Sequence, residues 1–274
     1  LHLLSRRQRQ MCIRDRGDTL TAIAEDKSHV ITGEQKCVYF AEQEPEVLEI
    51  LQRRAETLHI PYKIYGRDFH AENIRYTCFG MQFDVEIGDN IYADLQIPLL
   101  GEHQAKNCAL ALAVCVDVLS DLRRESAVFS LPDIRKNLSL LHWPGRMEVL
   151  RSKPFVLLDA CINATSCENV KEVLRHLGVW NCTVIVGIPE DKDYAGVVRS
   201  MKGMANRIIL TRSGNPHYHF SQKQQETLAE EDIGTIWTDS VKQALTLAGS
   251  CPDPIVILGT TSVISEVEQI FQQS

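Results

Sequence analysis

The fold is decided by residues 155–187, which read FVLLDACINATSCENVKEVLRHLGVWNCTVIVG. An apolar run opens this stretch and another closes it, and the residues between them place apolar side chains at helical spacing. The same unit recurs through residues 154–272, with apolar runs at 155–158, 183–186, 207–210, 234–237 and 255–258. Helical patterns follow near 166–177, 192–203, 221–230, 239–248 and 262–272. Apolar strands alternating with helices predict an α/β fold with a mainly parallel sheet and helices on both faces.

The residues before this repeat predict a smaller β structure and one long helix. Residues 79–87 and 91–99 alternate apolar and polar side chains around the turn Gly88-Asp89-Asn90, which is typical of a β-hairpin with one buried face. An alanine-rich helix is expected over 103–122. Shorter elements are expected at 19–31, 45–59 and 133–141 (helices) and at 37–40 (a strand).

Two boundaries divide the chain. Trp143-Pro144-Gly145-Arg146 cannot lie inside a helix, so we place a domain boundary near residue 149, between a region 17–148 and a region 149–274. Residues 1–16 carry five arginines without a helical apolar stripe and resemble translated sequencing-adaptor readthrough. We therefore expect a non-native or disordered tail there, and a natural chain that is longer at its N-terminus.

Composition narrows the class of protein. The 274 residues include 29 Lys and Arg against 36 Asp and Glu, a formal charge of −7, which argues against bulk nucleic-acid binding. The sequence contains no run of 18 apolar residues, so we expect no membrane-spanning helix. Nine cysteines without a Cys-x-x-Cys pair or a secretory signal indicate reduced thiols and a cytoplasmic protein.

Candidate site residues follow the predicted strands, because ligands of parallel sheets bind beyond the carboxyl ends of the strands. This rule selects the segments 159–163, 187–193, 211–215 and 259–262. Asp159 could accept hydrogen bonds from a ribose, or it could cap the helix that begins near residue 164. Asp191, in Asp191-Lys192-Asp193, could serve a substrate, although capping is favoured for this triplet. Thr260 lies in a hydroxyl-rich turn suited to a carboxylate or phosphate, or to a plain helix cap.

Two further candidates precede that sheet. His103 and Asn107 lie four residues apart near the start of the long helix, where free amides suit a nucleotide, although capping on a wet surface is the favoured interpretation. Arg146 follows a rigid Pro-Gly turn and could grip a phosphate or form a salt bridge between domains. The sequence lacks the Gly-x-Gly-x-x-Gly fingerprint, any Gly-Lys pair and a Gly-x-Ser-x-Gly elbow, which disfavours dehydrogenases and serine hydrolases.

Taken in order, these motifs resemble the folylpolyglutamate synthase/dihydrofolate synthase family of the Mur ligase superfamily. The matching segments are GDTLTAIAEDK at 17–27, LGEHQAKN at 100–107, WPGR at 143–146, the strand end at Asp159 and DKD at 191–193. The resemblance implies a Rossmann-like C-terminal domain preceded by an incomplete central ATPase domain.

The resemblance further implies an ATP-dependent ligase that adds L-glutamate to dihydropteroate or folate through an acyl phosphate, with ATP and Mg²⁺ required. It places Asn107, Arg146 and Asp159 at ATP and a carbamylated, magnesium-linked Lys27 in catalysis. Thr260 and, more weakly, Asp191 would lie on the substrate side, with no direct metal ligand in this part of the chain. The expected partners are small-molecule substrates, with no nucleic acid or membrane, and the protein is expected to be a monomer.

Two departures from the family pattern keep alternatives open. The family motif Asp-Gly-Ala-His-Asn stands here as DACIN at 159–163, with Ile162 at the histidine position. The phosphate loop and the upstream magnesium ligand are missing, so this fragment alone is expected to be inactive. The alternatives are a degenerate ligase that only binds a nucleotide or partner, and another amide ligase of the superfamily.

Overall fold

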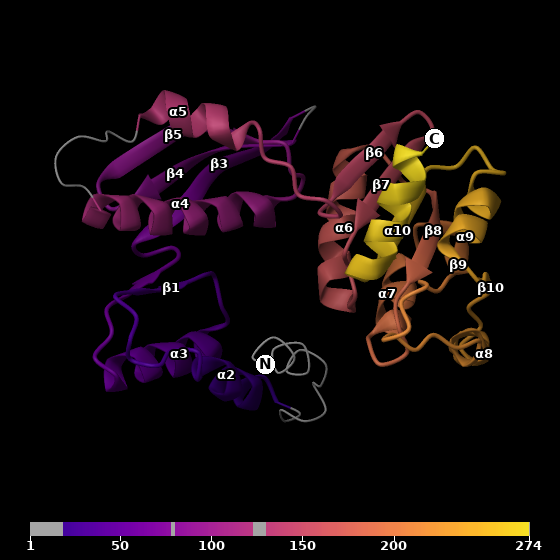
Figure 1. Ribbon diagram of the computed structural model, residues 1–274, viewed down its shortest axis with the longest axis horizontal. Helices are drawn as coiled ribbons and strands as arrows, with labels where there is room; N and C mark the ends of the chain where they lie inside the picture. The colour runs from indigo at the N-terminus through magenta and orange to yellow at the C-terminus, as the bar shows by residue number, and fades with distance from the viewer. Residues whose placement is uncertain (1–18, 78–79, 123–129, 274) are drawn as a thin grey trace. The chain divides into compact units, whose positions relative to one another are not determined.

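The computed structural model describes residues 19–77, 80–122 and 130–273. The predicted tail at 1–16 lies outside the described residues. The chain forms two compact units (Figure 1). The first unit comprises the described residues up to Arg75, with Gln82–Gln96 and Gln104–Leu138; the second comprises Tyr76–Met81, Ile97–His103 and Ser139 onward.

The second unit contains a six-stranded sheet in the order β10-β9-β8-β11-β7-β6. Its strands are β6 (Glu148–Ser152), β7 (Phe155–Asp159), β8 (Cys182–Gly187), β9 (Ala205–Leu210), β10 (Ile236–Trp237) and β11 (Ile255–Gly259). Every pairing is parallel except that of β6 with β7. The predicted mainly parallel sheet is therefore confirmed, with β6 as an additional antiparallel edge strand.

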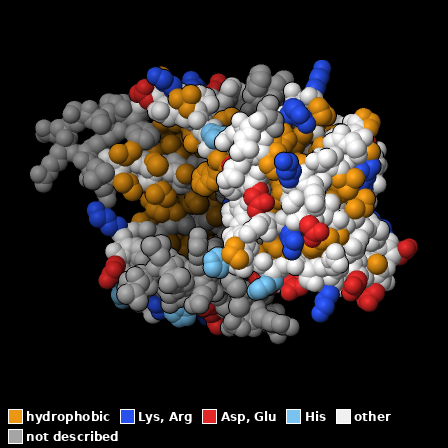
Figure 2. Space-filling view, turned by 45° about the vertical axis from the view of Figure 1, so that its right-hand side comes forward, with side chains coloured by type: hydrophobic (Ala, Val, Ile, Leu, Met, Phe, Trp, Pro, Cys, Tyr) orange, Lys and Arg blue, Asp and Glu red, His pale blue; other side chains and the backbone are white. Residues whose placement is uncertain are grey.

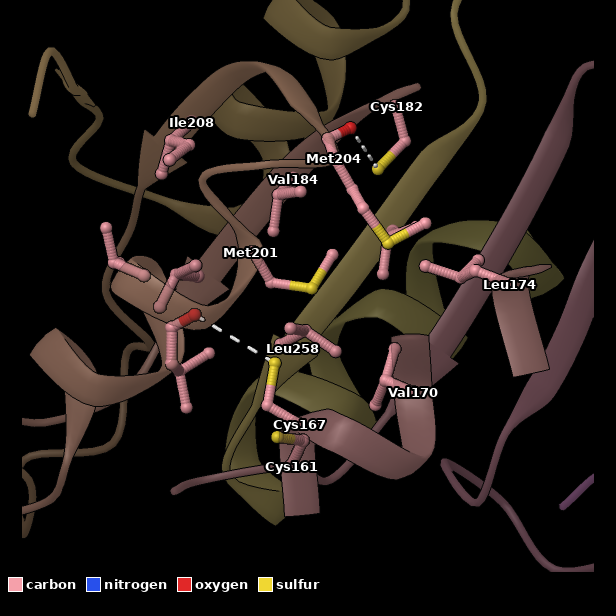
Figure 3. Close-up of a cluster of buried hydrophobic side chains, with 14 of the residues drawn as sticks. Cys161, Cys167, Val170, Leu174, Cys182, Val184, Met201, Met204, Ile208 and Leu258 are labelled. Carbon is pink, nitrogen blue, oxygen red and sulfur yellow. Dashed lines mark hydrogen bonds between the residues drawn. The ribbon is translucent and has the colours of Figure 1, made fainter. Parts of the chain in front are cut away.

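Helices cover both faces of this sheet (Figure 1). They are α6 (Ala164–His176), α7 (Tyr194–Met201), α8 (Lys223–Glu230), α9 (Val241–Ala248) and α10 (Thr261–Gln272). One core joins the sheet to α6, α7 and α8, and it includes Val170, Leu174 and Met201 (Figure 3). A separate core on the other face joins it to α9 and α10. The central strands β7, β8 and β11 are largely apolar because both of their faces are buried.

Two glycines let α10 approach the middle of the sheet. A Cβ at Gly187 would lie 2.6 Å from Cγ2 of Val263, and a Cβ at Gly259 would lie 2.7 Å from the backbone oxygen of Gly187. Real Cβ atoms do not make such short contacts, so only glycine fits at either position without a shift of its neighbours. Both glycines end central strands, and they bring the start of α10 close to the sheet edge where ligands are expected.

The elements before residue 139 form two small sheets with their helices. β1 (Val38–Phe40) pairs in parallel with β2 (Tyr62–Ile64), and these strands pack with α3 (Pro45–Thr57) in a small core. A three-stranded sheet contains β3 (Phe69–Thr77), β4 (Gly80–Ile87) and β5 (Asn90–Ile97). The remaining helices are α2 (Leu20–Ser28), α4 (Glu102–Leu122) and α5 (Leu131–Leu138). The hairpin β4–β5 matches the predicted one, whereas β2 and β3 were not predicted.

None of the helices in the described ranges is both long and apolar enough to cross a membrane. On the face of the second unit seen in Figure 2, basic and acidic side chains are interspersed. That face therefore lacks the single-sign basic stripe typical of a nucleic-acid interface.

Candidate functional site

The Trp143–Arg146 turn is fastened to the carboxyl end of β7. The backbone N–H of Ala160 donates to the oxygen of Gly145 at 2.8 Å, and the N–H of Met147 donates to Oδ2 of Asp159 at 2.9 Å. These two bonds flank Arg146 on either side. Asp159 therefore orients this turn and does not cap α6, because Asn163 fills that role by accepting from the N–H of Ser166 at 2.8 Å.

The turn has a strained and closely packed backbone. Gly145 and Met147 both have positive φ angles, of 64° and 47°, and a Cβ at Gly145 would lie 2.4 Å from Cγ2 of Ile264. The N–H of Gly145 also donates to Oε2 of Glu148 at 2.7 Å. These contacts hold the turn in one conformation and so fix the backbone position of Arg146.

Asp159 and Arg146 differ sharply in exposure. Asp159 is only 6% exposed, and burial raises the pKa of its carboxyl to about 6, although the N–H groups of Met147 and Cys161 and the charge of Arg146 oppose that rise. Arg146 is exposed and forms no ion pair within 4 Å among the described residues. A guanidinium without a carboxylate partner keeps its donors available for an anion.

His103 lies in the same electrostatic environment. Burial lowers the pKa of its imidazole, and the positive charge of Arg146 lowers this pKa further. Its ring packs directly over Gly101, where φ is +104° and a Cβ would lie 2.5 Å from Cε1 of the ring. The start of α4 thus adds a neutral histidine to the surroundings of Arg146. Sequence analysis placed His103 with Asn107 only, because the influence of Arg146 depends on tertiary structure.

Asn107 and Lys27 belong to the first unit, apart from Arg146 and Asp159. Asn107 lies on α4 one turn after His103, and Lys27 is exposed near the end of α2. The second unit therefore brings together Arg146, Asp159 and His103, while the positions of Asn107 and Lys27 relative to them stay a prediction.

Buried hydroxyls without partners gather in the loops at the carboxyl ends of β9 and β11. Thr260, Thr211 and Ser213 are each at most 6% exposed, and none of their hydroxyl oxygens has a hydrogen-bond partner in the structure. The loop after β9 contacts α10, since Nδ2 of Asn215 donates to Oγ of Ser262 at 2.8 Å. Buried hydroxyls normally form hydrogen bonds, so these three have donors left for a polar ligand or for water. The sequence selected Thr260 and the segment 211–215, but it did not single out Thr211 or Ser213.

In the Asp191-Lys192-Asp193 triplet, the first two residues form an ion pair and the third caps a helix. Asp193 accepts from the N–H of Gly196 at 3.0 Å and caps α7, and its other oxygen accepts from the N–H of Ala164 at 2.9 Å. Capping, the favoured interpretation, is thus correct for Asp193. Asp191 is exposed and pairs with Nζ of Lys192 at 3.1 Å.

The predicted link between Lys27 and Mg²⁺ stays a prediction. Within residues 19–77, 80–122 and 130–273, the one group of three close His, Cys, Asp or Glu ligand atoms is His70, Glu72 and Glu86, and Lys27 is outside it. Mg²⁺ usually keeps water ligands and takes only one or two carboxylates together with substrate phosphates, so a magnesium ion at Lys27 does not require such a group. Arg146, which forms no ion pair among the described residues, offers its donors to a phosphate group.

Comparison with known proteins agrees with this fold. Residues 14–115 match the Mur ligase middle domain. The chain is 26% identical over 254 residues to folylpolyglutamate synthase of Lacticaseibacillus casei, and this match covers 92% of the chain and 58% of the relative. It is 24% identical over 258 residues to dihydrofolate synthase/folylpolyglutamate synthase of Bacillus subtilis, with the same two coverages.

A solved structure of Mycobacterium tuberculosis folylpolyglutamate synthase, complexed with ADP and AMPPCP, superposes with a TM-score of 0.83 at 21% identity. The superposition covers 94% of this chain and 62% of that one, so the chain spans about three fifths of the length of these relatives. The comparisons thus confirm the resemblance that the motifs predicted: the chain is similar to folylpolyglutamate synthases and dihydrofolate synthases, and its residues 14–115 match the Mur ligase middle domain.

Proposed function

We propose that this chain is part of an ATP-dependent ligase that adds L-glutamate to dihydropteroate or folate. The names of its relatives support this reaction, and the M. tuberculosis structure was solved with ADP and AMPPCP. In the proposed reaction, the acceptor carboxylate attacks the γ-phosphorus of ATP, and ADP leaves. The amine of glutamate then attacks the resulting acyl phosphate, and inorganic phosphate leaves as the amide forms.

The observation that carries the proposal is the state of Arg146. It is exposed and without an ion pair among the described residues, on a turn fixed by Gly145 and by the carboxyl of Asp159. Such a preorganised guanidinium suits the phosphates of ATP, since phosphoryl transfer depends on positioning and on neutralising negative charge. Asp159 would then accept a hydrogen bond from the nucleotide with its remaining lone pairs, and Asn107 would contact ATP from α4.

The amino acid would bind where the unsatisfied hydroxyls lie. Thr260, Thr211 and Ser213 offer donors to a carboxylate at the carboxyl ends of β9 and β11. In this proposal Asp191 contributes a weaker substrate contact, and its ion pair with Lys192 would open to make it. Magnesium would enter as the counter-ion of ATP. Lys27 would act as a carbamylated lysine, for which the described geometry supplies no additional ligand cluster.

An assay of two proteins tests the proposal. The 274-residue chain and the complete reading frame that encodes it should be incubated with ATP, Mg²⁺, L-glutamate and either dihydropteroate or folate, while ADP and the glutamylated product are measured. We expect product from the complete reading frame and none from the 274-residue chain alone. Nucleotide binding without turnover in the complete protein would indicate a degenerate ligase. Turnover only with a peptidoglycan precursor would indicate another ligase of the superfamily.

The proposal also defines the partners. It requires only small molecules, namely ATP, L-glutamate and a pteroate or folate, and it involves neither nucleic acid nor a membrane. We place the protein in the cytoplasm as a monomer. Light scattering of the purified protein at micromolar concentration tests the monomeric state.

A further inference from the structure

A second candidate site lies on the hairpin of β3 and β4 and includes no residue assigned to the ligase reaction. His70 and Glu72 are two residues apart on β3, so their side chains point to the same face, and Glu86 on β4 joins them there. The ligand atoms of the three side chains all lie within 4.8 Å of one another. Nε2 of His70 is 3.5 Å from Oε2 of Glu86.

Charge within this group is unbalanced. No lysine or arginine in the described ranges lies within 4 Å of either Glu72 or Glu86, and the sole basic partner is the His70 imidazole. By contrast, a neighbouring carboxylate on the same hairpin, Asp84, accepts a hydrogen bond from the side chain of Asn73 at 2.8 Å. Two carboxylates that meet one imidazole without another cation form an anionic, half-buried set of ligands.

We propose that His70, Glu72 and Glu86 bind a divalent transition-metal ion of the zinc class. Metal–nitrogen and metal–oxygen bonds of about 2.0–2.2 Å separate the ligand atoms of a tetrahedral site by roughly 3.4 Å. The separation of His70 and Glu86 already matches this spacing, and the ligand atom of Glu72 lies within 4.8 Å of both. An imidazole with two carboxylates suits Zn²⁺, Co²⁺ or Mn²⁺, while Mg²⁺ prefers oxygen ligands alone. Three protein ligands leave one position for water.

Titration of the metal-free 274-residue chain with Co²⁺ tests this site. Visible absorption reports cobalt in a low-symmetry site, and thiolate-to-cobalt charge-transfer bands separately identify any binding by cysteine. We expect saturation at one equivalent without thiolate bands. The variants His70→Gln, Glu72→Gln and Glu86→Gln should each weaken this binding by more than about tenfold. His142→Gln is the matched control, because His142 also faces a glutamate, Glu148, at 4.0 Å but belongs to no group of three close ligand atoms among the described residues.

Three results would overturn the proposal: no cobalt spectrum in the parent chain, thiolate bands alone, or equal affinity in all four variants. Circular dichroism of each variant separates lost ligands from lost folding. Should His70→Gln unfold, Glu72→Gln decides the question, since Glu72 makes no ion pair within the described residues. Failure here leaves the ligase proposal untouched, because that proposal assigns no role to His70, Glu72 or Glu86.

Discussion

Asp159 is an acid whose surroundings oppose its ionisation. Its carboxyl is almost fully buried, and its pKa of about 6 lies above the ordinary value of 3.8. The folded chain therefore holds this proton more tightly than the unfolded chain does. It follows that Asp159 lowers the free energy of unfolding as the pH rises from about 4 to about 6, by an amount on the order of 3 kcal/mol above that window.

Asp159→Asn should consequently stabilise the fold at high pH. The amide oxygen can still accept from the N–H of Met147, and the buried charge is gone. We expect the variant to gain on the order of 1–3 kcal/mol at pH 8 and almost nothing at pH 4. Urea unfolding of both proteins across this range measures the difference. A gain independent of pH would show that the Asp159 carboxyl does not titrate in this window.

The link between Arg146 and His103 gives a second prediction at this scale. The charge of Arg146 contributes to the lowered pKa of the His103 imidazole. Arg146→Gln should therefore raise that pKa toward its ordinary value, while burial keeps it below. A pH titration of the histidine NMR signals measures this shift. Arg151→Gln is the control, because Arg151 stacks on Phe271 and does not affect His103; an equal shift in both variants would contradict the link.

Among the secondary-structure elements, α10 depends most visibly on glycine. The contact between Gly187 and Val263 predicts that Gly187→Ala destabilises the second unit by about 1–3 kcal/mol. Val263→Ala in the same chain should recover part of this loss, because it removes the methyl groups that a new Cβ would strike. Thermal unfolding of the single and double variants gives the coupling energy. Gly234→Ala, with nothing within 4 Å of its Cβ, should change little. Additive losses would exclude the close contact.

The sequence predicts those strands whose burial is reflected in a run of apolar residues. β7, β8 and β11 are buried on both faces, so their apolar runs show in the sequence. β6 is an edge strand with mostly polar, exposed residues and carries no such run. β3 also escapes prediction, because Asn73, with φ of +51°, interrupts a strand whose exposure does not alternate.

The candidate site was predictable in its members but not in its arrangement. The rule for strand ends selected Asp159 and Thr260. The fastening of Arg146 depends on backbone bonds between residues far apart in sequence, such as that of Ala160 with Gly145, which no spacing pattern records. The missing partners of Thr211 and Ser213 likewise become evident only when their surroundings are known.

At the scale of the whole molecule, the second unit can be tested for independence. Residues 139–274 contain all six strands and five helices of its sheet, but Leu100, which is buried in the same core, lies outside this fragment. We expect the isolated fragment to fold and to be less stable by about 2 kcal/mol than the same unit in the whole chain.

The tryptophans make this comparison direct, because all three, at positions 143, 180 and 237, lie in the second unit. Fluorescence during urea unfolding therefore follows this unit in the fragment and in the whole chain alike. A fragment without a cooperative transition would show that Tyr76–Met81 and Ile97–His103 are required for folding.

Asp193 links the loop that follows β7 to the loop that follows β8. Its two carboxylate oxygens serve the first turns of both α6 and α7, so the loop after β7 and the loop after β8 share a single anchor. If one loop moves, either the other loop moves with it or one of the two hydrogen bonds to Asp193 breaks. We therefore expect the two loops, which lie at the sheet edge next to Asp159, to move together when a molecule binds there. Asp193→Ala should allow each loop to move independently of the other.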